Sequence, residues 1–132
     1  MTKKISLFSV ITILLVFISS SGYCTDWLYF IESGAGDKHY IDLDSLKRSP
    51  ESIVSFKRKI ESGNPSKLSY VINDIDVDCK KEKIRMLSEK VYGPDGLTKT
   101  TKITSDWNAI NPEGIDESLY ELTCSLKKNR NQ

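Results

Sequence analysis

The sequence predicts an α+β fold, in which a six-stranded antiparallel sheet is followed by one C-terminal helix. Six short segments, rich in aromatic and β-branched residues, alternate between apolar and polar positions. One later segment instead places apolar residues at helical spacing. The six segments are joined by short connections, which favour antiparallel pairing because a parallel pair needs a long crossover.

The first half of the mature chain supplies three of these strands. Residues 27–31 form an aromatic and β-branched run that ends at a glycine-containing turn, so they predict a strand and a hairpin. Residues 39–42 resume the extended pattern, and residues 44–48 predict a helical turn or loop. Residues 53–61 then alternate, and Arg58 alone breaks the apolar face formed by Val54, Phe56 and Ile60.

The second half supplies the other three strands. Residues 68–79 are the longest candidate, and Cys79 lies in the same phase as the apolar residues, so it points toward the core. Residues 83–92 and 97–103 flank the turn sequence Gly93-Pro94-Asp95-Gly96 and should pair as a hairpin.

The predicted helix begins between Pro112 and Asp116 and ends near Ser125. Its core-facing stripe consists of Ile115, Leu119, Leu122 and Leu126. At about 100° per residue, Cys124 lies about 180° from Ile115. Either the helix ends before Cys124, or it is covered on more than one side.

Residues 1–24 are predicted to be a signal peptide. Lys3 and Lys4 precede an uncharged apolar run at 5–18, and small residues follow at 19–22. A membrane-spanning helix normally needs about 20 apolar residues, more than this run provides, although a retained anchor is the alternative. The expected organisation is a signal peptide at 1–24, one domain at 25–126 and a polar tail at 127–132.

The cleavage position decides the fate of the first of three cysteines. Small residues permit cutting after Gly22 or after Cys24, and a lipoprotein would instead carry its lipid on Cys24. Tyr23 disfavours lipidation, because such sites want a small residue there.

Export leads to an oxidising compartment, the periplasm or the outer cell surface, where Cys79 and Cys124 are expected to form a disulfide. That bond would close a loop of about 45 residues and stabilise the fold by roughly 4 kcal/mol. Two buried free thiols are the alternative.

The charge balance argues against a nucleic-acid binder. The chain has 19 basic and 18 acidic residues, and loss of Lys3 and Lys4 with the leader changes the formal charge to −1. The sequence predicts contact with a membrane only through the signal peptide or through lipidation at Cys24.

The sequence predicts no catalytic residue, metal site or cofactor. Asp74, Asp76 and Asp78 resemble the start of a calcium loop, but Cys79 and Arg85 stand where such a loop needs glycine and glutamate. We interpret these aspartates as a solvated strand face. His39 is the only histidine, and no nucleophile signature accompanies it.

Basic residues supply the ligand-binding candidates, namely Lys57, Lys59, Lys83 and Arg85. They would form a patch for acidic ligands if their strands lie side by side. The alternative is an ordinary charged edge that discourages aggregation. Trp107 is expected to pack the helix onto the sheet.

The order of several short blocks resembles the surface-adhesin E-like family of small exported bacterial domains over about residues 26–126. The blocks are Trp27, Tyr40-Ile41-Asp42, Ser45-Leu46-Lys47-Arg48, Asp78-Cys79, Ile84-Arg85, Tyr92, Gly96, Trp107, Ile110, Pro112, Leu119-Tyr120 and Cys124. The resemblance implies a six-stranded antiparallel sheet with a helix packed on it and a Cys79–Cys124 disulfide. The namesake of the family is an adhesin that binds host proteins such as laminin and vitronectin.

The resulting functional hypothesis is an exported, adhesin-like binding module of the envelope or surface that acts by contact with a matrix or envelope protein. A periplasmic envelope-assembly or stress component is the main alternative. A small periplasmic hydrolase is the other, but one histidine without a recognisable nucleophile gives it little support.

Overall fold

The computed structural model describes residues 25–64, 66 and 68–126. The predicted signal peptide and polar tail lie outside the described residues. In chain order the elements are β1 (Trp27–Glu32), β2 (Lys38–Asp42), the 3-10 helix η1 (Leu43–Ser45), β3 (Lys47–Arg48), β4 (Ile53–Glu61), β5 (Tyr70–Asp78), β6 (Lys83–Gly93), β7 (Gly96–Lys102), β8 (Asn108–Ala109) and α2 (Ile115–Ser125).

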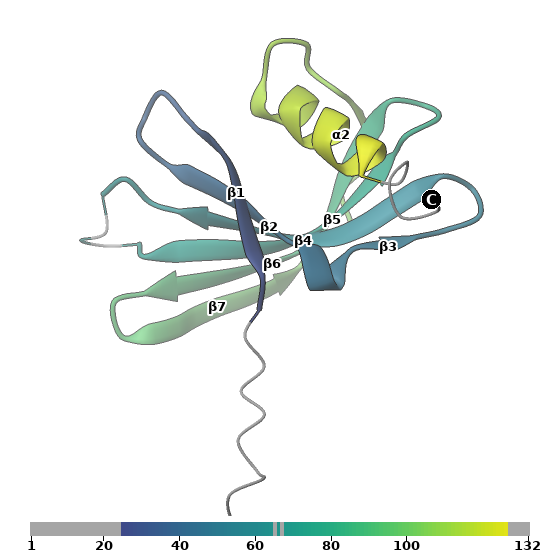
Figure 1. Cartoon of the computed structure of the whole chain (residues 1–132). Helices are drawn as coiled ribbons and strands as arrows, with labels where there is room; N and C mark the ends of the chain where they lie inside the picture. The colour runs from purple at the N-terminus through teal and green to yellow at the C-terminus, as the bar shows by residue number, and fades with distance from the viewer. Residues whose placement is uncertain (1–24, 65, 67, 127–132) are drawn as a thin grey trace, which may run out of the picture.

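The main strands form one antiparallel sheet in the order β1-β2-β4-β5-β6-β7. The six predicted strands and the C-terminal helix are confirmed. Two strands of two residues each were not predicted: β3 pairs with β4, and β8 pairs with β6. The strands fan out below α2, which lies across one side of the sheet (Figure 1).

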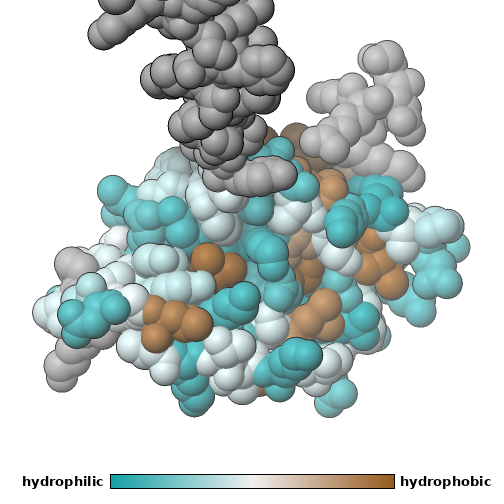
Figure 2. All heavy atoms as spheres, turned by 90° about the horizontal axis from the view of Figure 1, so that it is seen from below, coloured by the Kyte–Doolittle hydropathy of each residue, from teal (hydrophilic) through white to brown (hydrophobic). Residues whose placement is uncertain are grey.

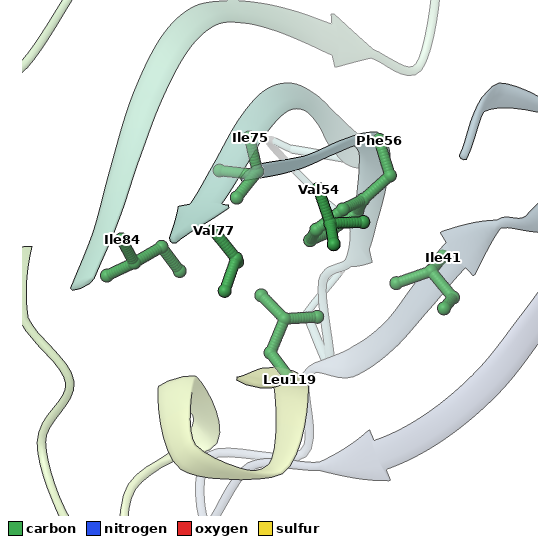
Figure 3. Packing of buried hydrophobic residues seen from close by; sticks show 7 residues of the cluster. All are labelled: Ile41, Val54, Phe56, Ile75, Val77, Ile84 and Leu119. Atoms are coloured by element: carbon green, nitrogen blue, oxygen red, sulfur yellow. The ribbon is translucent and has the colours of Figure 1, made fainter. Parts of the chain in front are cut away.

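The core lies between α2 and the facing side of the sheet. Figure 3 shows Leu119 of α2 pointing toward buried side chains that come from four strands. These are Ile41, Val54, Phe56, Ile75, Val77 and Ile84, each at most 8% exposed. The alternation predicted for residues 53–61 is therefore confirmed, because Val54 and Phe56 share the core side.

The disulfide joins Cys79, just after β5, to Cys124 in the last turn of α2, with the two Cα atoms 5.8 Å apart. The Tyr120 hydroxyl donates to the Cys79 carbonyl oxygen at 3.2 Å on the same flank of the helix. Helix α2 runs unbroken past Cys124, so it is covered on two sides: Leu119 meets the sheet, and Tyr120 and Cys124 meet the end of β5.

Two glycines are required by local geometry. Gly96 closes the β6–β7 hairpin at φ +108°, a left-handed conformation that glycine adopts without a steric penalty. Gly63 packs against the β1–β2 turn so closely that a Cβ atom there would lie 2.9 Å from the Ala35 carbonyl oxygen. Its amide donates to Asp37 Oδ1 at 2.9 Å, which joins the two turns at one end of the sheet.

Candidate functional site on the open sheet face

Helix α2 covers one face of the sheet, and no described element covers the other, which we call the open face. Lys57 and Lys59 on β4 alternate with the core residues Val54 and Phe56, so they project to the open face. The strand register places Lys83 and Arg85 of β6 on the same face. All four basic candidates therefore share one side of the molecule.

An acidic strand separates the two basic strands. Asp74 and Asp76 of β5 lie between β4 and β6, where Lys57 Nζ is 2.7 Å from Asp74 Oδ1. Arg85 donates through Nε and Nη2 to Asp76 Oδ2, at 3.0 and 2.8 Å. The structure thus brings these candidates into ion pairs with β5 rather than into one continuous basic patch.

The interpretation of this acidic strand as a solvated face is wrong at two positions. Asp76 is 4% exposed and also accepts from Ser55 Oγ at 2.6 Å. Asp78 is 8% exposed and accepts from the backbone amides of Lys80 and Lys81, which closes the β5–β6 turn. Both carboxylates have structural partners, because a buried carboxylate is costly without them.

A hollow of about 580 Å³ lies on the open face and is lined from η1, β3, β4, β5, β6 and β7. Lys47 and Lys102 line it from exposed positions, and neither joins an ion pair among the described residues. Leu87 also lines it, at the bulge where Asp74 pairs with Ser88 but Ile75 pairs with Met86. We call this feature the open-face hollow.

The carboxylate of Asp74 lies in the open-face hollow among basic groups. Burial opposes its ionisation, but hydrogen bonds from Lys57 and Ser88 and the nearby Lys90 bring the pKa of Asp74 below its ordinary value. Asp74 therefore stays charged and neutralises Lys57. Lys47 and Lys102, which the sequence pattern does not single out, add positive charge to the hollow, and the exposed Asp44 adds one further carboxylate.

Aromatic rings surround the remaining β4 candidate, Lys59. Its Nζ lies 4.5 Å from the centre of the Tyr40 ring and 5.2 Å from that of Trp27, within the range of cation–π attraction. It also pairs with Glu61 at 2.8 Å, and this hydrogen bond lowers the pKa of the Glu61 carboxyl. Lys59 is therefore engaged in local packing.

Trp107 lies over a basic residue of the open face rather than between helix and sheet. The centre of its ring is 4.4 Å from Cζ of Arg85, and Trp107 is not part of the core cluster. The expectation that it packs the helix onto the sheet is wrong, because the segment before β8 returns along β6 and brings the ring to Arg85.

Figure 2 shows the molecule from the side away from α2. Hydrophobic residues form small separate groups among hydrophilic ones there. This composition is that of ordinary protein surface, from which non-obligate interfaces do not differ in apolarity.

His39 lies away from the open-face hollow, on the helix side of the sheet. It is 6% exposed and packs edge-on against Phe30, with ring centres 6.1 Å apart. Burial and the nearby Arg58 lower its pKa, while Asp37 and Asp116 oppose the shift. The lone histidine is thus a buried residue beside the core and does not line the hollow.

The described residues contain no group of three or more His, Cys, Asp or Glu side chains arranged to hold a metal ion. Within the same residues, no helix has the length and apolarity that crossing a membrane requires.

Comparison with known proteins places this geometry in a family. The chain matches the family model described as surface-adhesin protein E over residues 27–125. A search of curated proteins found no match.

Two solved structures of Haemophilus influenzae protein E share the fold. Crystal form II is 14% identical, with a TM-score of 0.60 over 80% of this chain and 95% of that one. The other is 13% identical, with a TM-score of 0.56 over 78% of this chain and 89% of that one. Because the family model matches most of the chain, the protein belongs to the surface-adhesin protein E family.

Proposed function

We propose that the protein is an exported binding module of the cell envelope or cell surface, and that it contacts a protein partner through the open sheet face. The observation that carries the proposal is the open-face hollow, which is lined by Lys47 and Lys102, two cations without an ion pair among the described residues. The family supports a surface role, and the sequence of residues 1–24 supports export.

The partner that fits this surface is a protein with an exposed acidic segment. Lys47 and Lys102 attract carboxylates, while Asp74 neutralises Lys57 and Asp44 reduces the positive excess of the hollow. Leu87 gives the partner a small apolar contact. The earlier candidates Lys59, Lys83 and Arg85 would form the periphery of this surface.

Binding fits the geometry better than hydrolysis. A hydrolase needs a nucleophile, a base and a position for the reacting atom in one pocket. His39 is buried on the helix side, whereas Ser88 in the hollow donates to Asp74, whose pKa is lowered and whose other oxygen accepts from Lys57. A carboxylate stabilised in this way is a weak base.

Surface display is tested by treating intact cells with protease. An adhesin-like protein should be digested in intact cells, and its cleavage should not require prior permeabilisation. Full protection until the outer membrane is opened would instead support the periplasmic role in envelope assembly or stress.

Partner recognition is tested with the oxidised mature domain on immobilised laminin, vitronectin and envelope extract. The charge reversal Lys47→Glu with Lys102→Glu should weaken capture of a specific partner by at least about tenfold, or about 1.4 kcal/mol. The matched pair Lys38→Glu with Lys99→Glu changes the same charge at exposed sites outside the hollow and should retain capture. If both double variants lost capture equally, the effect would come from net charge alone. That result would refute the assignment of the hollow as the binding site.

A further inference from the structure

A second hollow, of about 380 Å³, lies on the helix side of the sheet, between the start of α2 and strands β4, β5 and β6. We call it the helix-side pocket. Ile75, Ile84 and Met86 supply its apolar lining. Ser105 and Asn108 also line it, as does Arg85, whose charge is paired with Asp76. Its volume falls in the range of about 300–1,000 Å³ that is typical of pockets for small molecules.

Arg58 contributes a positive charge that its surroundings satisfy only in part. Its Nη2 donates to Asn73 Oδ1 at 3.1 Å, but its Nε is buried and has no hydrogen-bond partner among the described residues. Burial lowers the pKa of the Arg58 guanidinium, and the negative charges of Asp116 and Glu89 oppose that shift. No ion pair of Arg58 occurs within the described part of the chain.

Asp116 contributes the opposite charge from the first turn of α2. It too makes no ion pair among the described residues. The pocket therefore has a guanidinium on one element and a carboxylate on another, with apolar side chains also in its lining. A simple anion would be attracted by Arg58 but repelled by Asp116. A simple cation would be attracted by Asp116 but repelled by Arg58.

We propose that the helix-side pocket binds a small zwitterion, of which a free α-amino acid with an apolar side chain is the simplest example. The ligand carboxylate pairs with the planar guanidinium of Arg58, which donates only to Asn73 among the described residues. The ligand ammonium pairs with Asp116, and the side chain lies over Ile84 and Met86. This site goes beyond the proposed function, because it lies on the other side of the sheet and takes a small molecule.

The test is a nuclear magnetic resonance titration of the oxidised mature domain with L-leucine, N-acetyl-L-leucine and L-leucinamide. Leucine should shift the amide signals of Met86, Ser105 and Asp116 in a saturable way, with a Kd on the order of 1 mM. N-acetyl-leucine lacks the ammonium group and leucinamide lacks the carboxylate, so each should bind roughly tenfold more weakly.

Asp116→Asn should weaken leucine binding by roughly tenfold. Glu121→Gln changes an exposed acid of the same helix outside the pocket and should leave the affinity unchanged. The two blocked ligands test the charges without altering the protein, so the result does not depend on whether an Arg58 variant folds.

Three outcomes would overturn the proposal: no saturable shift with leucine, methionine or phenylalanine, equal binding of the blocked ligands, or shifts that map to another surface. None of these bears on partner capture by the open face.

Discussion

The buried polar side chains of this sheet fall into two groups, those with a full set of hydrogen-bond partners and those with a nitrogen that lacks one. Asp76 is enclosed by Ser55 and Arg85, and its carboxylate accepts three hydrogen bonds from them. Arg58 and His39, on the opposite side of the sheet, each keep a buried nitrogen without a partner among the described residues. The first group stabilises the fold, whereas a buried polar atom without a partner lowers its stability.

Asp76→Ala should destabilise the oxidised domain by about 3 kcal/mol, because it leaves Arg85 without its carboxylate and Ser55 without its acceptor. Urea unfolding followed by circular dichroism measures the change. Glu121→Ala, at an exposed helix position, should stay within about 0.5 kcal/mol of the wild type. Similar values for the two variants would show that the Asp76 network contributes little.

His39 should make stability fall as the pH drops from about 7 to 5.5. Burial lowers its pKa in the folded state below the ordinary value of 6.5, so the unfolded chain binds the proton more readily in this range. His39→Phe removes this proton uptake and should flatten the dependence of unfolding free energy on pH. Equal slopes for the two proteins would exclude His39 as the cause. Asp74 and Glu61, whose folded pKa values are lowered, lose their contribution only at more acidic pH.

At the scale of elements, helix α2 depends on both its core contact and its covalent attachment. Leu119 is fully buried against the sheet, and Cys124 joins the last helical turn to the end of β5. An isolated helix of 11 residues is marginal in water, so these attachments determine whether it forms.

Replacing both Cys79 and Cys124 by serine should lower the free energy of unfolding by about 4 kcal/mol, since the bond closes a loop of 45 residues. Equilibrium urea unfolding measures the loss, and amide hydrogen exchange should accelerate first in α2. A loss below about 1 kcal/mol would contradict the chain-entropy explanation.

Leu119→Ala should cost about 3 kcal/mol by leaving a cavity under α2 with the disulfide intact. Leu122→Ala is the matched comparison on the same helix and should cost less, because Leu122 is only partly buried. The same unfolding experiment compares the two variants, and a larger loss for Leu122 would place the helix contact elsewhere.

At the scale of the whole molecule, strand periodicity and one helical stripe were sufficient to predict the six main strands and α2. The short strands β3 and β8 have two residues each, too few for a period, so their pairing was missed. Alternation also cannot distinguish a solvated acidic face from one paired across strands, which is why the burial of Asp76 was not foreseen.

The open-face hollow depends on strand order and on the bulge at Leu87, and neither has a clear local signal. Lys47 lies in a segment interpreted as a turn, and Lys102 is far away in sequence from Lys57. Only the folded sheet brings the three lysines to one hollow.

The open-face hollow is tested most directly by a lysine-acetylation footprint of the oxidised domain with and without a captured protein partner. Lys47 and Lys102 should become protected, while the exposed Lys99, on the other side of β7, should keep its reactivity. Unchanged reactivity at Lys47 and Lys102 in the saturated complex would contradict the assignment of the open face as the binding surface.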